Sequence, residues 1–163
     1  MPSFSRKEVM ILTRCSSSRL AYLEKVRLIV PERINTRDPR FTWEQMIAIR
    51  IIKVLRKEHP TSIVRAIIEL ICDKGLSQVY QGQQIAVLEN QAFWVSSNWS
   101  NFGEAFRQTL RSVGKHPQKA GTYRFFIAPP LRDTMLTIWD EARHSPLINY
   151  TSFVAKTQRA FKE

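Results

Sequence analysis

The chain has 163 residues, 44% of them hydrophobic, which is enough to fill the core of one ordinary domain or of two small ones. Lysine and arginine number 25 against 14 aspartate and glutamate residues, so the formal net charge is +11. This is the composition of a folded protein. Its basic excess favours a polyanionic partner, either nucleic acid or an anionic membrane surface.

The apolar pattern excludes membrane-spanning and secreted proteins. No run of about eighteen apolar residues occurs, and the segment from Met1 to Lys7 lacks the apolar stretch that a secretory signal needs. The sequence therefore predicts a cytoplasmic protein, associated with the nucleoid if the polyanion is DNA, and without a membrane partner.

The reactive side chains form no recognisable catalytic or metal-binding motif. Cys15 and Cys72 have no cysteine or histidine neighbour at ligand spacing, and His59, His116 and His144 are isolated. No glycine-rich phosphate loop or nucleophile motif is visible. We therefore expect no metal, no cofactor and no catalytic residue, and hence a protein that is not an enzyme.

Two short helices are predicted at the start of the chain. Ser5 and Glu8 have the S-x-x-E spacing of a capping box, so the first helix should begin there. Ser16 or Ser17 can cap a second helix, whose apolar positions follow the helical period at Leu20 and Leu23.

A strand, a turn and two helices are predicted next. Val26–Val30 is rich in β-branched residues and should form a brief strand, and residues 35–39 form a turn cluster. A second capping box, T-x-x-Q, begins at Thr42 and opens an apolar helix through about Lys57. After Pro60, Thr61 and Ser62 can cap a further helix that ends at Gly75.

Beyond Gly75 the pattern changes, which predicts a boundary between residues 1–75 and residues 76–163. The second part should hold strands at 84–89, 92–96 and 122–128, and helices at 99–113, 131–143 and 151–162. The predicted fold class is therefore α+β: a mostly helical N-terminal part with a helix, a turn, a helix and a wing, followed by a small mixed α/β C-terminal unit.

The second helix combines short polar residues with cations at its first turn. A helix in the major groove reads bases with that turn, and hydroxyls, amide groups and the helix dipole suit phosphate contacts. Ser16, Ser17, Ser18 and Arg19 fit this need, with Arg14 and Lys25 at the flanks. Arg33, Arg37 and Arg40 fall in the loop after the predicted strand, where a wing would touch the DNA backbone.

Residues 4 to about 58 resemble the winged helix-turn-helix of the mercury-resistance regulator (MerR) family of transcription factors. The family's aromatic and serine pair and its acidic residue in the first helix match Phe4-Ser5 and Glu8. Its signature V-S-x-x-T-L-R-Y-Y-E aligns with CSSSRLAYLE at residues 15–24. The following apolar pair and proline match residues 28–31, and the wing motif R-x-Y-T is similar to residues 40–42.

The resemblance implies that Ser16, Arg19, Tyr22 and Arg40 meet double-stranded DNA. It also implies a homodimer, RNA polymerase as a further partner, and a C-terminal part that dimerises or senses an effector that the sequence does not identify. The candidate DNA-binding residues are Arg14, Ser16, Ser17, Ser18, Arg19, Tyr22, Lys25, Arg33, Arg37 and Arg40.

The chain departs from the family at several of the compared positions, four of which bear on the predicted motif. Ala21 and Leu23 replace an arginine and a tyrosine of the signature. Arg14 and Arg27 replace two glycines, one in the turn and one after the second helix, where a positive φ is harder for a residue with a side chain to adopt.

Other interpretations of the same residues stay open. The serines can simply cap a surface helix, and the arginine loop can simply be solvated. Residues 92–95 with Trp99, Phe102 and Phe106 can form core, an aromatic pocket or a dimer interface. The alternative function is a DNA-bending architectural or recombination accessory protein, similar to excisionases; a third is an enzyme in the C-terminal half with an N-terminal DNA tether.

Overall fold

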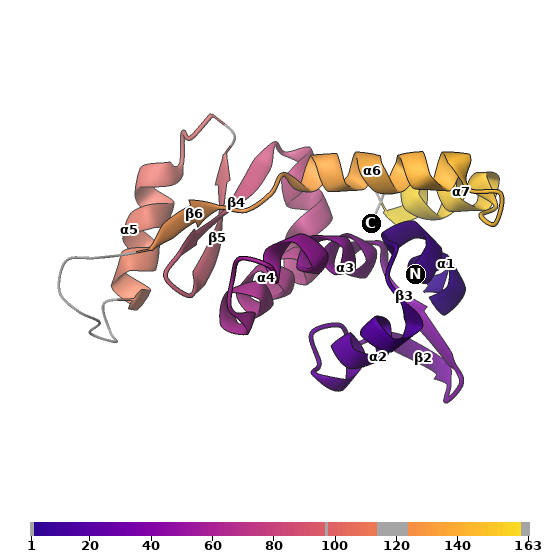
Figure 1. The fold of residues 1–163 in the computed structure, drawn as a ribbon. Coiled ribbons are helices and arrows are strands. Elements are labelled where there is room, and N and C mark those ends of the chain that lie inside the picture. Colours follow the sequence, from indigo (N-terminus) through magenta and orange to yellow (C-terminus); the bar gives the residue numbers. More distant parts are fainter. Residues whose placement is uncertain (1, 97, 114–123, 161–163) are drawn as a thin grey trace. The chain divides into compact units, whose positions relative to one another are not determined.

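The computed structural model describes residues 2–96, 98–113 and 124–160, and its architecture is α+β (Figure 1). The chain divides into two compact units. Unit 1 holds the residues up to Val54 and those from Arg132 onward, and unit 2 holds Leu55–Leu131.

The N-terminal segment of unit 1 alternates short strands with helices. Its elements are β1 (Phe4–Ser5), α1 (Arg6–Thr13), α2 (Ser17–Lys25), β2 (Glu32–Asn35), β3 (Asp38–Phe41) and α3 (Trp43–Leu55). The three strands form an antiparallel sheet in the order β1-β3-β2, in which Phe4 pairs with Phe41 and Glu32 with Arg40. The sheet ties the start of the chain to a hairpin that follows α2 (Figure 1).

The predicted helix starts in this segment are confirmed. Ser5 and Glu8 form the reciprocal capping box of α1, with the Ser5 amide donating to Glu8 Oε2 at 2.7 Å. Ser16 caps α2 by accepting from the Arg19 amide at 3.3 Å. Thr42 and Gln45 form the second box, because each backbone amide donates to the other residue's side chain.

The core of unit 1 joins both ends of the chain. Helices α6 (Leu131–His144) and α7 (Tyr150–Ala160) supply its C-terminal part. The Phe153 ring lies 6.0 Å from that of Phe4 and 5.9 Å from that of Trp43, and all three side chains are fully buried. Trp139 packs edge-on against Phe153 at 5.1 Å. Buried aromatic side chains of this size dominate core energetics, so α7 is integral to unit 1.

This packing differs from the predicted division at residues 75 and 76. The C-terminal helix groups with the N-terminal segment, and the predicted boundary falls inside α4 (Thr61–Tyr80). Contacts between residues so distant in sequence leave no trace in local periodicity.

The predicted strand Val26–Val30 is wrong. The amides of Leu28 and Ile29 both donate to the carbonyl of Leu23, at 3.0 and 3.3 Å, which ends α2 with a capped turn. Leu28 and Ile29 are buried, and the strand begins only at Glu32, after Pro31.

Unit 2 contains a second antiparallel sheet. The elements of unit 2 are α4, β4 (Gln83–Leu88), β5 (Gln91–Ser96), α5 (Phe102–Val113) and β6 (Phe125–Ile127). The three strands form the sheet in the order β5-β4-β6. Central β4 is buried from Ile85 to Leu88. Phe125 contacts the rings of α5, whereas Phe126 points to the other face and stacks on His59 with ring centroids 4.1 Å apart.

The predicted elements of unit 2 are found, with corrections at their ends. The helix predicted at residues 99–113 begins only at Phe102, because Trp99 lies in a turn with a φ of 62°. Pro60, not Thr61 or Ser62, is the N-cap of α4, with no side-chain cap bond, and the helix continues through Gly75 to Tyr80. Residues 122 and 123 of the predicted third strand, and residues 161 and 162 of the last helix, lie outside the described residues.

Candidate nucleic-acid interface

Helix α2 follows α1 after a turn of three residues, 14–16. Arg14 takes up a left-handed conformation with φ 53°, and the Cys15 amide donates to the Met10 carbonyl at 3.2 Å. This turn sets the start of α2. Leu20 and Leu23 are then buried on one side of the helix.

The opposite side of α2 is open to solvent. Ser16, Ser17 and Ser18 are exposed at its first turn, and Ser16 and Ser18 place their hydroxyl oxygens 3.3 Å apart. Tyr22 is 44% exposed and Lys25 is exposed, while Arg19 is half-buried. The structure therefore brings the predicted α2 residues together on one accessible stretch.

The arginines predicted in a loop lie instead on a hairpin. Arg33 is in β2, Arg40 is in β3, and only Arg37 is in the connecting turn. The Asn35 side-chain oxygen accepts from the Arg37 amide at 3.0 Å, an Asx turn that allows the two strands to pair closely. The Arg37 side chain is exposed at the hairpin tip.

Glu24 ties α1, α2 and the hairpin together. Its two carboxylate oxygens accept from Arg6 Nη1 at 2.5 Å and from Arg33 Nη2 at 2.8 Å. The Glu24 side chain is only 13% exposed, so this network is partly shielded from solvent. Arg33 also donates to the Thr36 carbonyl at 3.1 Å, which braces the hairpin turn.

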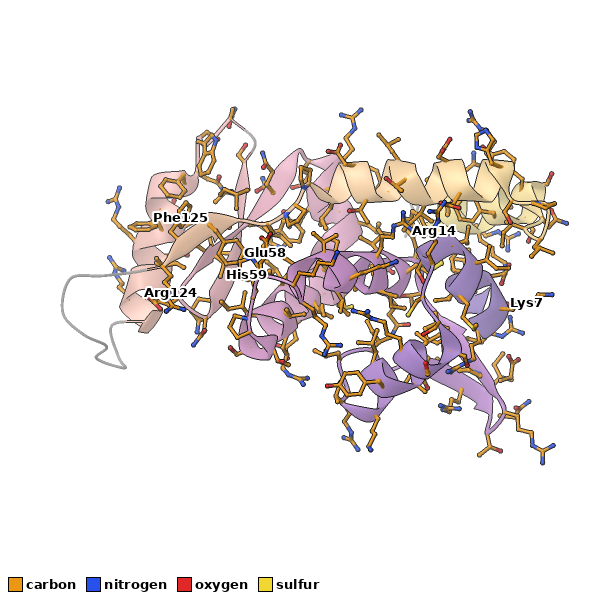
Figure 2. The ribbon with its side chains drawn as sticks, in the orientation of Figure 1. Lys7, Arg14, Glu58, His59, Arg124 and Phe125 are labelled. Atoms are coloured by element: carbon orange, nitrogen blue, oxygen red, sulfur yellow. The ribbon has the colours of Figure 1, made fainter. Side chains whose placement is uncertain are left out.

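Two more of the predicted cations have internal partners. Arg40 donates through Nε and Nη2 to Asp38 Oδ2, at 3.1 and 3.0 Å. Arg14 (Figure 2) pairs with Glu141 of α6 at 2.5 Å. For Arg19, Lys25 and Arg37, in contrast, the described part of the chain offers no carboxylate within ion-pair distance of the side chain.

Two titratable groups near the interface are perturbed. Burial of the Glu8 carboxyl raises its pKa, but hydrogen bonds from Lys156 and Ser5 outweigh that effect and leave the pKa below its ordinary value of 4.5. Burial raises the pKa of the Cys15 thiol. The positive charges of Arg19, Lys53 and Arg6 lower it, but by less, so the pKa stays above its ordinary value. Cys15 is therefore a buried thiol beneath the turn.

Four residues that add contacts or charge to unit 1 were not predicted from the sequence. Glu24 and Arg6 were not identified because their pairing joins two helices. Lys53 of α3 donates to the Arg14 carbonyl at 3.5 Å, from a position far along the chain. Lys7 is exposed on α1 and adds a cation to unit 1 (Figure 2). In the sequence, only the overall excess of basic residues indicated that such a cation would be present.

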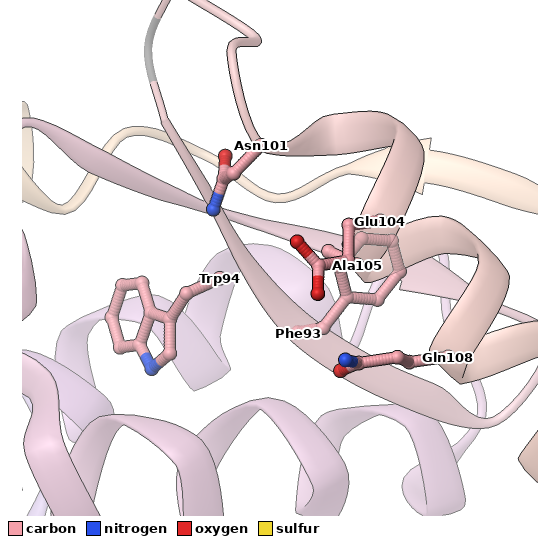
Figure 3. Close-up of a pocket in the computed structure, with 6 residues that line it drawn as sticks. All are labelled: Phe93, Trp94, Asn101, Glu104, Ala105 and Gln108. Carbon is pink, nitrogen blue, oxygen red and sulfur yellow. The ribbon is translucent and has the colours of Figure 1, made fainter.

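Unit 2 has a separate open hollow of about 360 Å³ between β5 and α5 (Figure 3). Phe93, Trp94, Asn101, Glu104, Ala105 and Gln108 line it. Among these six, Glu104 alone is titratable. In the described ranges no group of three or more His, Cys, Asp or Glu side chains could hold a metal ion.

No helix among the described residues is long and apolar enough to cross a membrane. A scan of protein-family models and a search of curated proteins both found no match for the chain. The function proposed next depends on the geometry of α2 and the β2–β3 hairpin.

Proposed function

We propose that the chain is a sequence-specific DNA-binding transcription regulator with a MerR-like winged helix-turn-helix, acting as a homodimer in the cytoplasm on nucleoid DNA. The observation that carries this proposal is the exposed first turn of α2. Ser16, Ser17 and Ser18 are open to solvent, while Leu20 and Leu23 anchor the other side of the helix in the core.

Backbone conformation at two positions supports the winged motif. Arg14 and Arg27 have φ of 53° and 57°, at the two places where the resembling family has glycine. A non-glycine residue in this region is uncommon, so both turns keep the glycine-like geometry although the side chains differ. The β2–β3 hairpin that follows is in the place of a wing.

In this proposal the first turn of α2 lies in the major groove. The serine hydroxyls and the amides at the positive end of the helix reach base edges and phosphate oxygens, and Arg19 supplies a base or phosphate contact. Arg37 at the hairpin tip reaches the neighbouring phosphates. Arg33 and Arg40 act mainly through Glu24 and Asp38, by fixing the hairpin beside α2.

A two-fold dimer would present two α2 helices to grooves about one DNA turn, or a multiple of it, apart. Unit 2 is then available for dimerisation or effector sensing, and RNA polymerase is a further partner implied by the family resemblance.

Gel shifts of random genomic fragments, followed by footprinting, test this proposal. One or a few high-affinity promoter sites with pseudo-palindromic footprints are expected. Scattered binding, or binding confined to attachment sites, would favour an architectural or recombination protein, and no binding to any fragment would overturn the proposal. Sedimentation with the footprinted site should show two chains per site.

A further inference from the structure

Unit 2 carries a row of aromatic rings, here called the aromatic ridge, made of Trp99, Phe102, Phe106 and Phe125. The Phe102 ring lies 5.0 Å from Trp99, 5.3 Å from Phe106 and 5.7 Å from Phe125. Phe106 and Phe125 are 6.3 Å apart. The ridge thus joins the turn before α5, one side of α5, and the edge strand β6 (Figure 1).

The aromatic ridge is not a closed core. Trp99 is 43% exposed and Phe125, labelled in Figure 2, is 42% exposed, while Phe102 and Phe106 are partly exposed. Four neighbouring rings that all keep contact with water form one exposed aromatic surface. Phe93 and Trp94, by comparison, line the hollow on the β5 side of α5 (Figure 3).

Trp99 is held in its exposed position by a braced turn. Its φ is 62°, an uncommon conformation for a bulky residue, which the surrounding contacts must stabilise. The Trp99 amide donates to the Ser96 carbonyl at 2.8 Å, and the Phe102 amide donates to the Trp99 carbonyl at 3.1 Å. Asn101 Oδ1 accepts from the Ser96 amide at 2.7 Å, so the indole is presented from a fixed backbone.

Cations flank the aromatic ridge. Arg107 follows Phe106 on α5 and is exposed; its Nε donates to the Gly103 carbonyl at 3.1 Å. A side chain at Gly103 would come within 3.6 Å of Arg107 Nη2, so the guanidinium lies against the backbone of Gly103, next to Phe102 in the chain. Arg111, one turn further on, is exposed, as is Arg124 beside Phe125 (Figure 2).

Glu104, the acidic residue of α5, lines the hollow next to β5 with Asn101 and Gln108 (Figure 3). It also lines a second hollow with Arg107 and Arg111, so these two arginines share their surface with one carboxylate. From residue 55 to residue 131 the sequence has nine Lys or Arg against five Asp or Glu. The surface around the aromatic ridge therefore combines exposed rings with Arg107, Arg111 and Arg124, against the carboxylates of Glu104 and of Glu89, which accepts from the Arg124 amide at 2.8 Å. The excess of basic residues in unit 2 keeps its net charge positive.

We propose that the aromatic ridge binds single-stranded nucleic acid, by stacking unpaired bases on Trp99 and Phe125 and pairing the backbone phosphates with Arg107 and Arg111. Aromatic faces beside a positively charged track are the means by which proteins bind single strands without reading sequence. Because residues 55–131 carry more basic than acidic side chains, charge favours a polyanion over a second copy of the same unit. This site goes beyond duplex recognition by α2.

Fluorescence anisotropy of the full chain with labelled oligothymidylate and oligouridylate of about 16 nucleotides tests the proposal. The wild-type protein should bind at least one of the two strands. Trp99→Leu and Phe125→Leu should each weaken binding about tenfold, because each removes one stacking surface while keeping an apolar side chain. Arg107→Gln should weaken binding and lower its salt dependence. Comparing the two strands distinguishes DNA from RNA.

A matched control separates this site from general charge and from α2. Tyr80→Leu, at a 50% exposed aromatic of the same unit, should leave single-strand binding unchanged. Arg19→Ala should also leave it unchanged, and Trp99→Leu should leave duplex binding unchanged. Melting curves verify that each variant folds; if one leucine variant does not, the other and Arg107→Gln decide. Wild-type affinity in the folded ridge variants, or no binding by the wild-type chain, would overturn the proposal.

Discussion

The carboxylate of Glu24 accepts from the guanidinium of Arg33 at 2.8 Å and so fixes the β2–β3 hairpin beside α2. Because the same carboxylate also pairs with Arg6, it sets the relative position of α1, α2 and the hairpin. In a winged DNA-binding protein this position decides whether helix and wing reach the duplex together.

Glu24→Gln should lower both stability and duplex affinity. The change removes the negative charge between two arginines in a site that is 13% exposed, and we expect a loss of about 1 to 2 kcal/mol in the free energy of unfolding. Denaturant titration measures the loss, and gel shifts measure the affinity. Glu32→Gln, an exposed position in the same hairpin, is the control and should change neither quantity.

Arg19→Ala should weaken binding to the footprinted site by roughly 1 to 3 kcal/mol if the guanidinium reaches a base edge. Arg19→Lys keeps the charge but not the planar fork, so it should lose specificity while keeping non-specific affinity. Competition with random duplex DNA separates the two effects. Unchanged specificity in both variants would place the recognition surface elsewhere.

Arg37→Ala should lower affinity for all duplex sequences alike and reduce the slope of log affinity against log salt by about one unit. The reason is that, in the proposed complex, the guanidinium at the hairpin tip contacts phosphates and not bases. Arg132→Ala makes the same charge change at an exposed position of α6 and should leave the slope unaltered. Equal slopes for Arg37→Ala and wild type would argue against the wing contact.

Leu20→Asp should unfold α2 and the N-terminal part of unit 1. Leu20 is fully buried, and an unpaired carboxylate there costs several kcal/mol, about 3 to 5 by comparison with broken buried ion pairs. Circular dichroism during thermal melting measures the effect. Ala21→Asp, at the exposed neighbouring position, should melt close to the wild-type temperature.

Glu8 should make unit 1 sensitive to acid. Its pKa in the folded chain is below the ordinary 4.5, so the charged form contributes stability above that pH, and this contribution is lost as the pH falls through the folded value. Denaturation at several pH values should show a smaller acid loss for Glu8→Gln than for wild type. Lys156→Met, which removes the amine 2.8 Å from Glu8, should reduce the acid loss likewise. An unchanged pH profile in both would contradict this assignment.

Local signals predicted the helix starts of unit 1 and the exposed serines, because a cap is decided within about four residues of sequence. Ser16 and the Thr42–Gln45 box show this directly. The strand predicted from the β-branched run at residues 26–30 was wrong because burial and hydrogen bonds, and not local propensity, decide the conformation there. Burial of Leu28 and Ile29 and their bonds to Leu23 outweighed strand propensity.

Contacts between residues far apart in the chain could not be predicted from the sequence. Glycine often ends a helix, yet α4 continues through Gly75 to Tyr80. Among the site residues, the exposure of Arg37 followed from its turn, but the ion pair of Arg14 with Glu141 depends on how α6 packs. In that packing Trp139 contacts Phe153, and the spacing of residues in the sequence does not indicate this contact.

The shared burial of Phe4, Trp43 and Phe153 has a consequence for biosynthesis. A ribosome extends the chain at about 5 to 20 residues per second, so Trp43 emerges roughly 5 to 20 s before Phe153. During that interval the first two rings lack the third as cover and are open to chaperones. Unit 2 is made of the continuous residues 55–131, so it can fold before α7 has been synthesised. The N-terminal segment of unit 1 cannot complete its core until α7 is available.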